Sequence, residues 1–323
     1  MQYRTLTGTG VTISRASLGT MTFGNETDEA TAIRMLHMAL DAGVTWIDTA
    51  DAYTAGRSEE ITGKALQGHR DDVVLASKVV NYAGGNPQRD TGLHRWHVIN
   101  GVERSLRRLN TDRLDILYMH RPDYQTPIEE TLAAFDTLVQ QGKVVYVGMS
   151  NYASWQLCET LFKARINRWA PPVVTQVPYN LLTRRIEQEL LPFVREHRLG
   201  VTVYNPLAGG YLTGKYHAEA RPTAGARLGE SEAYFDRYWK DANFRAVARL
   251  QEIANQAGLT LIELSLRWLL AQDAVDSIIL GARTPGHLSN NLAALDGALD
   301  ADTLKACDEA WDMVRGVDFQ YNR

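Results

Sequence analysis

The chain has 323 residues and a formal net charge of −4, with 45% hydrophobic and 22% charged residues. This is an ordinary globular composition, and the length fits one large α/β barrel or two smaller domains. The small negative charge and the pI of 6.1 exclude a basic surface field for nucleic acid or for an acidic membrane.

Short β-branched strands alternate with amphipathic helices from one end of the chain to the other. Eight strands are predicted, at 15–19, 44–48, 72–77, 114–119, 144–149, 172–177, 200–205 and 276–280. The helical patterns between them carry helix-start and helix-stop signals. Gly43 ends the first helix, and Pro127 stands in the first turn of the helix after the fourth strand. Short β–α connections imply parallel strands, so eight such units predict an α/β fold of the (β/α)₈ TIM-barrel type.

A doubly wound open sheet is the rival fold, but it normally carries a Gly-rich turn between its first strand and first helix. Here the Gly8-Thr9-Gly10 stretch lies between two alternating segments, and no helix follows it. Residues 3–13 are therefore expected to form a β-hairpin at the bottom of the barrel. The expected organisation is a single domain over 1–323, with a long loop for substrate and cofactor at 209–244 and a C-terminal helix and tail at 301–323.

Three consecutive predicted strands end in ionisable groups. Asp48 ends the second strand, Lys78 follows the third at once, and His120 follows the fourth, while Tyr53 lies in the loop after Asp48. Polar residues at the carboxyl ends of barrel strands converge on the active-site mouth. Each of the four residues, taken alone, could have only a structural role. Their occurrence together at neighbouring strand ends predicts one site.

The chemistry of this set is that of carbonyl reduction. A phenol is a poor acid at neutral pH, and a nearby ammonium group lowers its pKa by stabilising the phenolate. Asp48 beside Lys78 would keep the lysine charged and oriented. Tyr53 could then donate a proton to a carbonyl oxygen while His120 supplies a second hydrogen bond, provided that a hydride donor is bound.

The blocks IDTADAY, SKV, LYMHRPD and VGMSNY occur in the order found in aldo-keto reductases, and the chain resembles that family over essentially its whole length. The resemblance implies a (β/α)₈ barrel in which Asp48, Tyr53, Lys78 and His120 form the catalytic tetrad, with Tyr53 as the acid. It also implies a nicotinamide cofactor bound without a Rossmann fold, so the missing GxGxxG motif agrees with the family.

Residues after the fifth to seventh strands are candidates for binding that cofactor. The side chains of Ser150, Asn151 and Gln176 suit a nicotinamide carboxamide, and the ring of Tyr204 could stack on the nicotinamide. The next run, NPLAGGYLTGKY, combines small residues with a lysine and suits a pyrophosphate, although by itself it could be only a tight strand exit. Its candidate residues are Asn205, Leu207, Gly209, Gly210 and Lys215.

The segment after the eighth strand supplies further candidates: Gly281, Arg283, Thr284, His287 and Asn291. Arg283 lies before a predicted helix at 284–295, whose amino terminus favours anions. The resemblance implies that this segment holds an adenosine 2′-phosphate, so NADPH is predicted over NADH. Relatives often carry Gln at position 287 and Ser at position 283, and this chain departs from them at both.

RPDYQTPIEETL, SNYASWQ and FDRYWKDANF resemble the aflatoxin-aldehyde and succinic semialdehyde reductases. That resemblance implies that Arg237 and Arg323 hold a substrate carboxylate, whereas composition alone would make both of them surface arginines. Trp239 and its aromatic neighbours could wall a substrate cavity or pack within their own loop. The expected partner is a small carbonyl compound.

Two other functions stay open. A cofactor-sensing binding subunit of the potassium-channel β type would show slow turnover. A metal-dependent barrel hydrolase would need more His or carboxylate ligands than Asp48 and His120, so no metal is expected.

Several features favour a cytoplasmic protein without a membrane partner. The amino terminus lacks the pattern of a secretory signal, and no apolar run approaches the roughly 20 residues of a membrane-spanning helix. Cys158 and Cys307 are the only cysteines, too few for a disulfide framework. The sequence leaves a homo-oligomer open.

Overall fold

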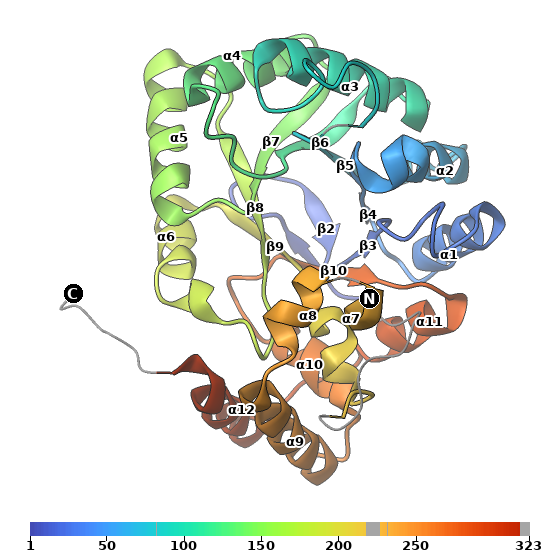
Figure 1. The fold of residues 1–323 in the computed structure, drawn as a ribbon, viewed down its shortest axis with the longest axis vertical. Coiled ribbons are helices and arrows are strands. Elements are labelled where there is room, and N and C mark those ends of the chain that lie inside the picture. Colours follow the sequence, from blue (N-terminus) through green and yellow to red (C-terminus); the bar gives the residue numbers. More distant parts are fainter. Residues whose placement is uncertain (82, 218–226, 231, 317–323) are drawn as a thin grey trace. The chain divides into compact units, whose positions relative to one another are not determined.

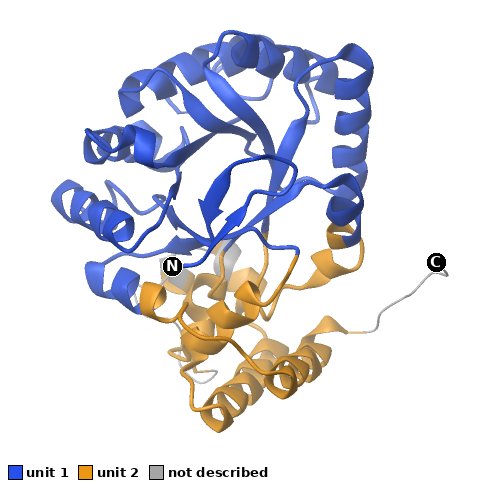
Figure 2. Ribbon diagram, turned by 180° about the vertical axis from the view of Figure 1, so that it is seen from behind, with its two compact units in different colours: residues 1–177, 192–204, 274–290 blue, residues 178–191, 205–273, 291–323 orange. Residues whose placement is uncertain are grey.

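The structure is a computed structural model that describes residues 1–81, 83–217, 227–230 and 232–316. Two compact units are distinguished within it (Figure 2). Unit 1 comprises 1–177, 192–204 and 274–290, and unit 2 comprises the described residues among 178–191, 205–273 and 291–323. The organisation of the chain as a single domain stays a prediction.

Eight parallel strands close into a barrel (Figure 1), which confirms the predicted (β/α)₈ fold. Each predicted strand is present, with ends shifted by two residues at most. Around the barrel the strands are β3 (Ala16–Gly19), β4 (Trp46–Asp48), β5 (Val74–Val79), β6 (Leu114–Met119), β7 (Val144–Ser150), β8 (Pro172–Pro178), β9 (Gly200–Tyr204) and β10 (Ser277–Gly281). β10 pairs in parallel with both β9 and β3 and so completes the ring.

The predicted hairpin closes the end of the barrel at which the strands begin. β1 (Tyr3–Thr5) pairs antiparallel with β2 (Thr12–Ser14), so the hairpin extends one residue beyond the predicted range. Leu6 and Ile13 are fully buried and belong to the same apolar cluster as Trp46, the first residue of β4. Asp48, the last residue of that strand, therefore lies at the opposite, carboxyl end.

Helices follow the strands as the alternation predicts. Those of the first half are α1 (Glu29–Asp41), α2 (Arg57–Ala65), α3 (Arg95–Leu109), α4 (Ile128–Gln140) and α5 (Ser154–Asn167). α2 was not predicted. It packs closely on α3, because a Cβ atom added at Gly63 would lie 2.5 Å from the backbone oxygen of Leu109. Only a glycine permits this approach.

The later helices correct the prediction of a long loop at 209–244. That stretch contains most of the 3₁₀ turn η4 (Ala208–Thr213), then α7 (Arg227–Glu230), α8 (Glu232–Tyr238) and the start of α9 (Asp241–Gln256). α9 was missed, although Ala246, Leu250 and Ile253 recur at helical spacing and are buried. The remaining helices are α6 (Leu190–His197), α10 (Leu261–Leu270), α11 (Pro285–Ala293) and α12 (Ala301–Arg315). No helix among the described residues is both long and apolar enough to cross a membrane.

Candidate active site

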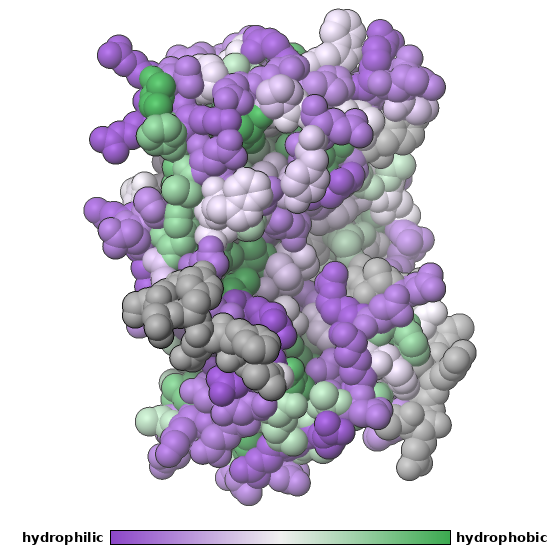
Figure 3. Space-filling model, turned by 60° about the vertical axis from the view of Figure 1, so that its left-hand side comes forward, coloured by the Kyte–Doolittle hydropathy of each residue, from purple (hydrophilic) through white to green (hydrophobic). Residues whose placement is uncertain are grey.

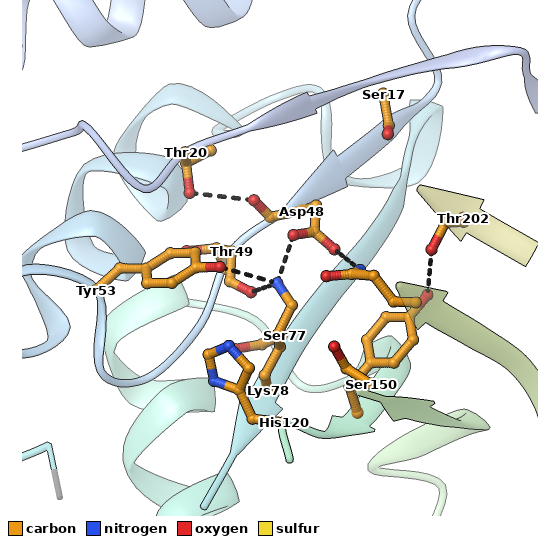
Figure 4. A network of polar contacts seen from close by, with 12 residues as sticks. Ser17, Thr20, Asp48, Thr49, Tyr53, Ser77, Lys78, His120, Ser150 and Thr202 are labelled. Atoms are coloured by element: carbon orange, nitrogen blue, oxygen red, sulfur yellow. Dashed lines mark hydrogen bonds and ion pairs between the residues drawn. The ribbon is translucent and has the colours of Figure 1, made fainter. Parts of the chain in front are cut away.

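The candidate catalytic side chains continue a layer of inward-facing residues. Side chains alternate along a strand, so the residue two positions after an inward-facing one points the same way. Trp46, Ala76, Tyr118 and Val174 belong to the buried cluster inside the barrel. The residues two positions later are Asp48, Lys78, His120 and Gln176. The predicted convergence of Asp48, Lys78 and His120 is thus a consequence of strand geometry (Figure 4).

Lys78 lies at the centre of the group. Its ammonium nitrogen donates to Asp48 Oδ1, to the Thr49 carbonyl oxygen at 2.8 Å and to Tyr53 Oη at 3.4 Å (Figure 4). The position predicted for Lys78, just after its strand, is wrong in detail, because β5 continues to Val79 and carries Lys78 within it. A residue inside a barrel strand is held more rigidly than one in the loop that follows.

Lys78 and Asp48 form a buried ion pair whose side chains are 0% and 3% exposed. Burial is the largest single influence and lowers the pKa of Lys78, but Asp48 and Tyr53 together outweigh it, and the pKa is raised above its ordinary value of 10.5. The second carboxylate oxygen of Asp48 accepts a hydrogen bond from Gln176 Nε2 at 2.8 Å. Lys78 is therefore an ammonium group at any neutral pH.

Tyr53 is the first residue of a tight turn, η1 (Tyr53–Gly56), which follows β4. Thr54 and Ala55 adopt φ values of 51° and 52°, and Gly56 has a φ of 92°. Left-handed backbone costs roughly 1–2 kcal/mol for each non-glycine residue. The Thr54 hydroxyl donates to the Phe23 carbonyl oxygen at 3.0 Å and anchors the turn. This strained turn directs the phenol toward the strand ends.

His120 lies beside the phenol as a neutral imidazole. The centroids of the Tyr53 and His120 rings are 5.9 Å apart, with the rings edge to face at 77°. Burial, and next the charges of Lys78 and Arg121, lower the pKa of His120 to about 3. Asn81 Oδ1 accepts from Arg121 Nε, which turns the Asn81 amide nitrogen to His120 Nδ1 at 3.4 Å. Nδ1 then accepts, and the single ring proton lies on Nε2.

Three of the residues predicted for the nicotinamide form one network next to this group. Asn151 Nδ2 donates to Ser150 Oγ and to the His120 carbonyl oxygen, both at 3.0 Å. The Tyr204 hydroxyl donates to Asn151 Oδ1 at 2.8 Å. The structure thus brings Ser150, Asn151 and Tyr204 together, whereas the amide nitrogen of Gln176 is directed to Asp48.

The run predicted for the pyrophosphate belongs to unit 2 and forms the turn η4. Gly209 and Gly210 adopt φ values of 66° and 91°, which favour glycine. Their N–H groups are bonded within the turn, to Asn205 Oδ1 at 2.6 Å and to the Leu207 carbonyl oxygen at 2.9 Å. A Cβ atom added at Gly210 would lie 3.1 Å from Lys215 Nζ, so the lysine amine lies close against this backbone. The lysine is a cationic group close to the backbone of this turn.

The segment predicted for the 2′-phosphate follows Gly281, the exposed last residue of β10. The Arg283 guanidinium forms an ion pair through Nε with Glu26, and the two side chains are 24% and 17% exposed. The Thr22 hydroxyl donates to the Ala282 carbonyl oxygen at 2.8 Å, and the Thr27 hydroxyl donates to the Arg283 carbonyl oxygen at 3.0 Å. These hydrogen bonds join the loop after β3 to this segment. A carboxylate therefore occupies one edge of the guanidinium that was assigned to phosphate.

The helix after this segment is shorter than predicted, since α11 begins at Pro285 and ends at Ala293 rather than spanning 284–295. The Thr284 hydroxyl accepts from the His287 N–H at 3.2 Å and caps the first turn. His287 is exposed, and Asn291, which belongs to unit 2, is 6% exposed.

Two of the residues assigned to the substrate, Arg237 and Trp239, lie in unit 2. Trp239 stacks on Phe235 with centroids 5.3 Å apart and contacts Phe244 edge to face at 4.9 Å. This packing favours the alternative in which the aromatic residues pack within their own segment. Arg237 is exposed near the end of α8, and Arg323 lies outside the described residues.

Several residues that contact the candidate groups were not predicted, among them Thr49, Asn81 and Glu26. Thr49 acts through its backbone oxygen, and Glu26 lies far from Arg283 in the sequence. Asn81 follows β5 closely, which is the only signal that could have identified it. Over the described part of the chain, no group of three or more His, Cys, Asp or Glu side chains is arranged to hold a metal ion.

Comparison with known proteins agrees with this geometry. The model of the Aldo/keto reductase family matches residues 15–312. The chain is 37% identical over 302 residues to a probable voltage-gated potassium channel subunit beta of Arabidopsis thaliana, which covers 92% of each protein. It is 36% identical over 315 residues to aflatoxin B1 aldehyde reductase member 2 of Mus musculus, covering 92% of this chain and 84% of that protein. It is 37% identical over 295 residues to the aldo-keto reductase YhdN of Bacillus subtilis, covering 89% and 87%. The chain belongs to the aldo/keto reductase family.

Proposed function

We propose that this protein reduces aldehydes or ketones to alcohols with NADPH, using Tyr53 as the general acid. Membership of the aldo/keto reductase family supports oxidoreductase activity. The role of Tyr53 as the acid is supported by the 3.4 Å distance between Tyr53 Oη and Lys78 Nζ. The ion pair with buried Asp48 keeps Lys78 charged. A phenol beside a permanent ammonium group is poised to release its proton.

Each residue of the group has a distinct part in this proposal. Tyr53 donates its proton to the carbonyl oxygen as negative charge develops there, and the Lys78 ammonium stabilises the phenolate that remains. The neutral His120 donates from Nε2 to the same oxygen and orients the substrate, since its lowered pKa of about 3 keeps it uncharged. Asp48 fixes the lysine in place and does not contact the substrate.

NADPH, when bound, would supply the hydride. The residues proposed to hold its nicotinamide are Ser150, Asn151 and Tyr204, with Gln176 beside them. The donor set of hydroxyl and amide groups fits a carboxamide, and the linked network restricts their rotamers. In unit 2, Lys215 offers a cation to the pyrophosphate, and Asn205, Leu207, Gly209 and Gly210 form the turn beneath it.

The preference for NADPH over NADH is proposed to depend on Arg283. Further residues proposed to contact the cofactor there are Gly281, Thr284, His287 and Asn291. A guanidinium binds a phosphate well, but Glu26 already pairs with this one. The Glu26 carboxylate repels a 2′-phosphate and so reduces the preference that Arg283 creates. Comparing the KM values for NADPH and NADH in wild type and in Arg283→Ala tests the assignment. An unchanged NADPH preference in that variant would contradict it.

The substrate is proposed to be a small aldehyde or ketone, as the name of the mouse aflatoxin B1 aldehyde reductase suggests for that relative. Arg237 and Arg323 are proposed to bind a substrate carboxylate, and Trp239 to border the substrate. The two free cysteines, Cys158 and Cys307, support a cytoplasmic location.

A second candidate function comes from the Arabidopsis relative, whose name is that of a potassium channel subunit. In that case the same site would bind NADPH and report its redox state with slow turnover. NADPH oxidation should be followed with a panel of four-carbon semialdehydes, dicarbonyls, aromatic aldehydes and keto sugars. Turnover on the order of 1–10³ s⁻¹ with one class supports the reductase. Tight NADPH binding with slow turnover across the whole panel favours the binding subunit.

A further inference from the structure

Helix α5 of unit 1 is apolar on two opposite faces. Leu157, Thr160 and Ala164 form its inner face and are 0 to 1% exposed against the barrel. On the outer face, Trp155, Phe162 and Ile166 are 62%, 63% and 62% exposed. A surface helix normally buries one apolar stripe and turns polar residues outward. The outer face of α5 departs from that rule.

The exposed residues form one continuous stripe along the helix. At 3.6 residues per turn, positions 155, 158, 162 and 166 all lie within about 40° of one line. Cys158, which is exposed, completes the stripe between Trp155 and Phe162. Figure 3 shows hydrophobic side chains in a column on the side of unit 1 that carries α5. An apolar patch of this kind on a folded chain marks an interaction surface.

The charges beside the stripe point to one particular partner. Lys163 forms ion pairs of 2.7 Å with both Glu159, on α5, and Glu129, on α4. Glu159 and Lys163 lie one helical turn apart on the same side of the stripe, about 60° and 100° from its line at 3.6 residues per turn. Both signs of charge therefore lie on one edge, next to the apolar centre.

We propose that α5 pairs with α5 of a second copy of this chain, antiparallel about a twofold axis through Phe162. With such an axis the same edge of the stripe from each copy lies side by side, and the two helices run in opposite directions. Glu159 of one copy then lies about 3 Å along the axis from Lys163 of the other, at a rise of 1.5 Å per residue. Cys158 of each copy meets Ile166 of the other, and the two Phe162 rings meet at the axis.

A parallel pair lacks this complementarity. In a parallel pair the twofold axis runs along the helices. The side of the stripe that bears Glu159 and Lys163 then faces the other side of the partner's stripe. The residues there at the height of Glu159 are Cys158 and Leu161. The charges would then gain no partner of opposite sign. The antiparallel pair is also self-complementary in the sense that an isologous dimer requires. The proposal does not depend on the function of the active site.

Sedimentation equilibrium of the full chain tests the dimer. The range should run from about 1 µM to about 100 µM, since an interface made mainly by one helix is at the small, weak end of protein interfaces. Wild type is expected to dimerise, and Phe162→Glu to remain monomeric. The matched control is Trp96→Glu, on α3, because Trp96 is 57% exposed and lies off the stripe. A monomeric wild type, or a dimeric Phe162→Glu, overturns the proposal.

Two measurements guard against a trivial loss of fold and test the register. Circular dichroism and the unfolding midpoint should be unchanged in Phe162→Glu, and Ile166→Glu replaces it if they are not. Glu159→Lys and Lys163→Glu should each weaken self-association, because each puts like charges opposite one another. Mixing the two variants should restore a dimer at least tenfold stronger than either alone, as unlike charges again meet across the interface. No restoration on mixing contradicts the antiparallel pair.

Discussion

Replacing Lys78 with methionine should be among the most destabilising single changes in the barrel. The ammonium group lies within a side chain that is 0% exposed, and its partner Asp48 is 3% exposed. Methionine fills similar space but removes the cation, so the Asp48 carboxylate stays buried with only Gln176 as a donor. Breaking one partner of a buried ion pair costs about 3–5 kcal/mol. That is a large fraction of the roughly 5–15 kcal/mol that stabilises a typical domain.

The double variant Asp48→Asn with Lys78→Met separates charge from packing. Because it leaves no unpaired buried charge, it should be more stable than Lys78→Met alone. The pKa of Lys78 is raised above 10.5, so the stabilisation by the pair is present below pH 10.5 and is lost as the pH rises through the raised pKa. Neutral pH is therefore the correct condition for the comparison.

Urea unfolding at pH 7 measures these free energies. The control is Lys143→Met, which removes an ion pair with Glu103 whose side chains are 32% and 35% exposed, and it should cost about 0–1 kcal/mol. A cost for Lys78→Met no larger than for the control, or a double variant less stable than the single one, would mean that the Asp48 carboxylate does not need the lysine charge.

Glu26→Gln should lower the KM for NADPH by about tenfold and leave that for NADH unchanged, since removing one charge beside Arg283 relieves repulsion of a 2′-phosphate. A raised NADPH KM would show instead that Glu26 positions the arginine. The pKa of His120 lies at about 3 in the fold against 6.5 ordinarily, so its protonation opposes folding. Stability should fall by up to about 1.4 kcal/mol per pH unit as the pH drops below 6.5, and His120→Gln should show a smaller slope in urea unfolding. Gly63→Ala should cost about 1–3 kcal/mol, measured in the same way, because its methyl group would collide with the Leu109 backbone. An unchanged midpoint would mean that α2 can shift.

The arrangement of strands was predictable from the sequence because a barrel repeats one simple pattern. Each strand is a short β-branched run, and each ends where polar residues begin. Asp48, Lys78 and His120 converge because residues two positions earlier, Trp46 and Ala76 among them, face the barrel interior. The strand–helix alternation predicted the fold, and the place of these groups at three consecutive strand ends predicted that they meet.

The missed features depend on contacts between distant segments. Nothing in the local sequence indicates that Glu26 pairs with Arg283, since the two residues lie in the loops after β3 and β10. α2 was missed because its glycine at position 63 weakens the helical pattern, and the need for that glycine is apparent only from the approach of α3. The segment at 209–244 was predicted as a loop because its glycines and proline obscured the short helices.

Replacing Tyr53 with phenylalanine separates the proposed proton donor from the residues proposed to bind the cofactor. The variant keeps the ring that lies beside His120 and removes only the hydroxyl. The kcat of Tyr53→Phe should fall by about 10²–10⁴-fold, while the Kd for NADPH, measured by fluorescence titration, should stay close to that of wild type. Turnover near the wild-type value in Tyr53→Phe would mean that another group donates the proton.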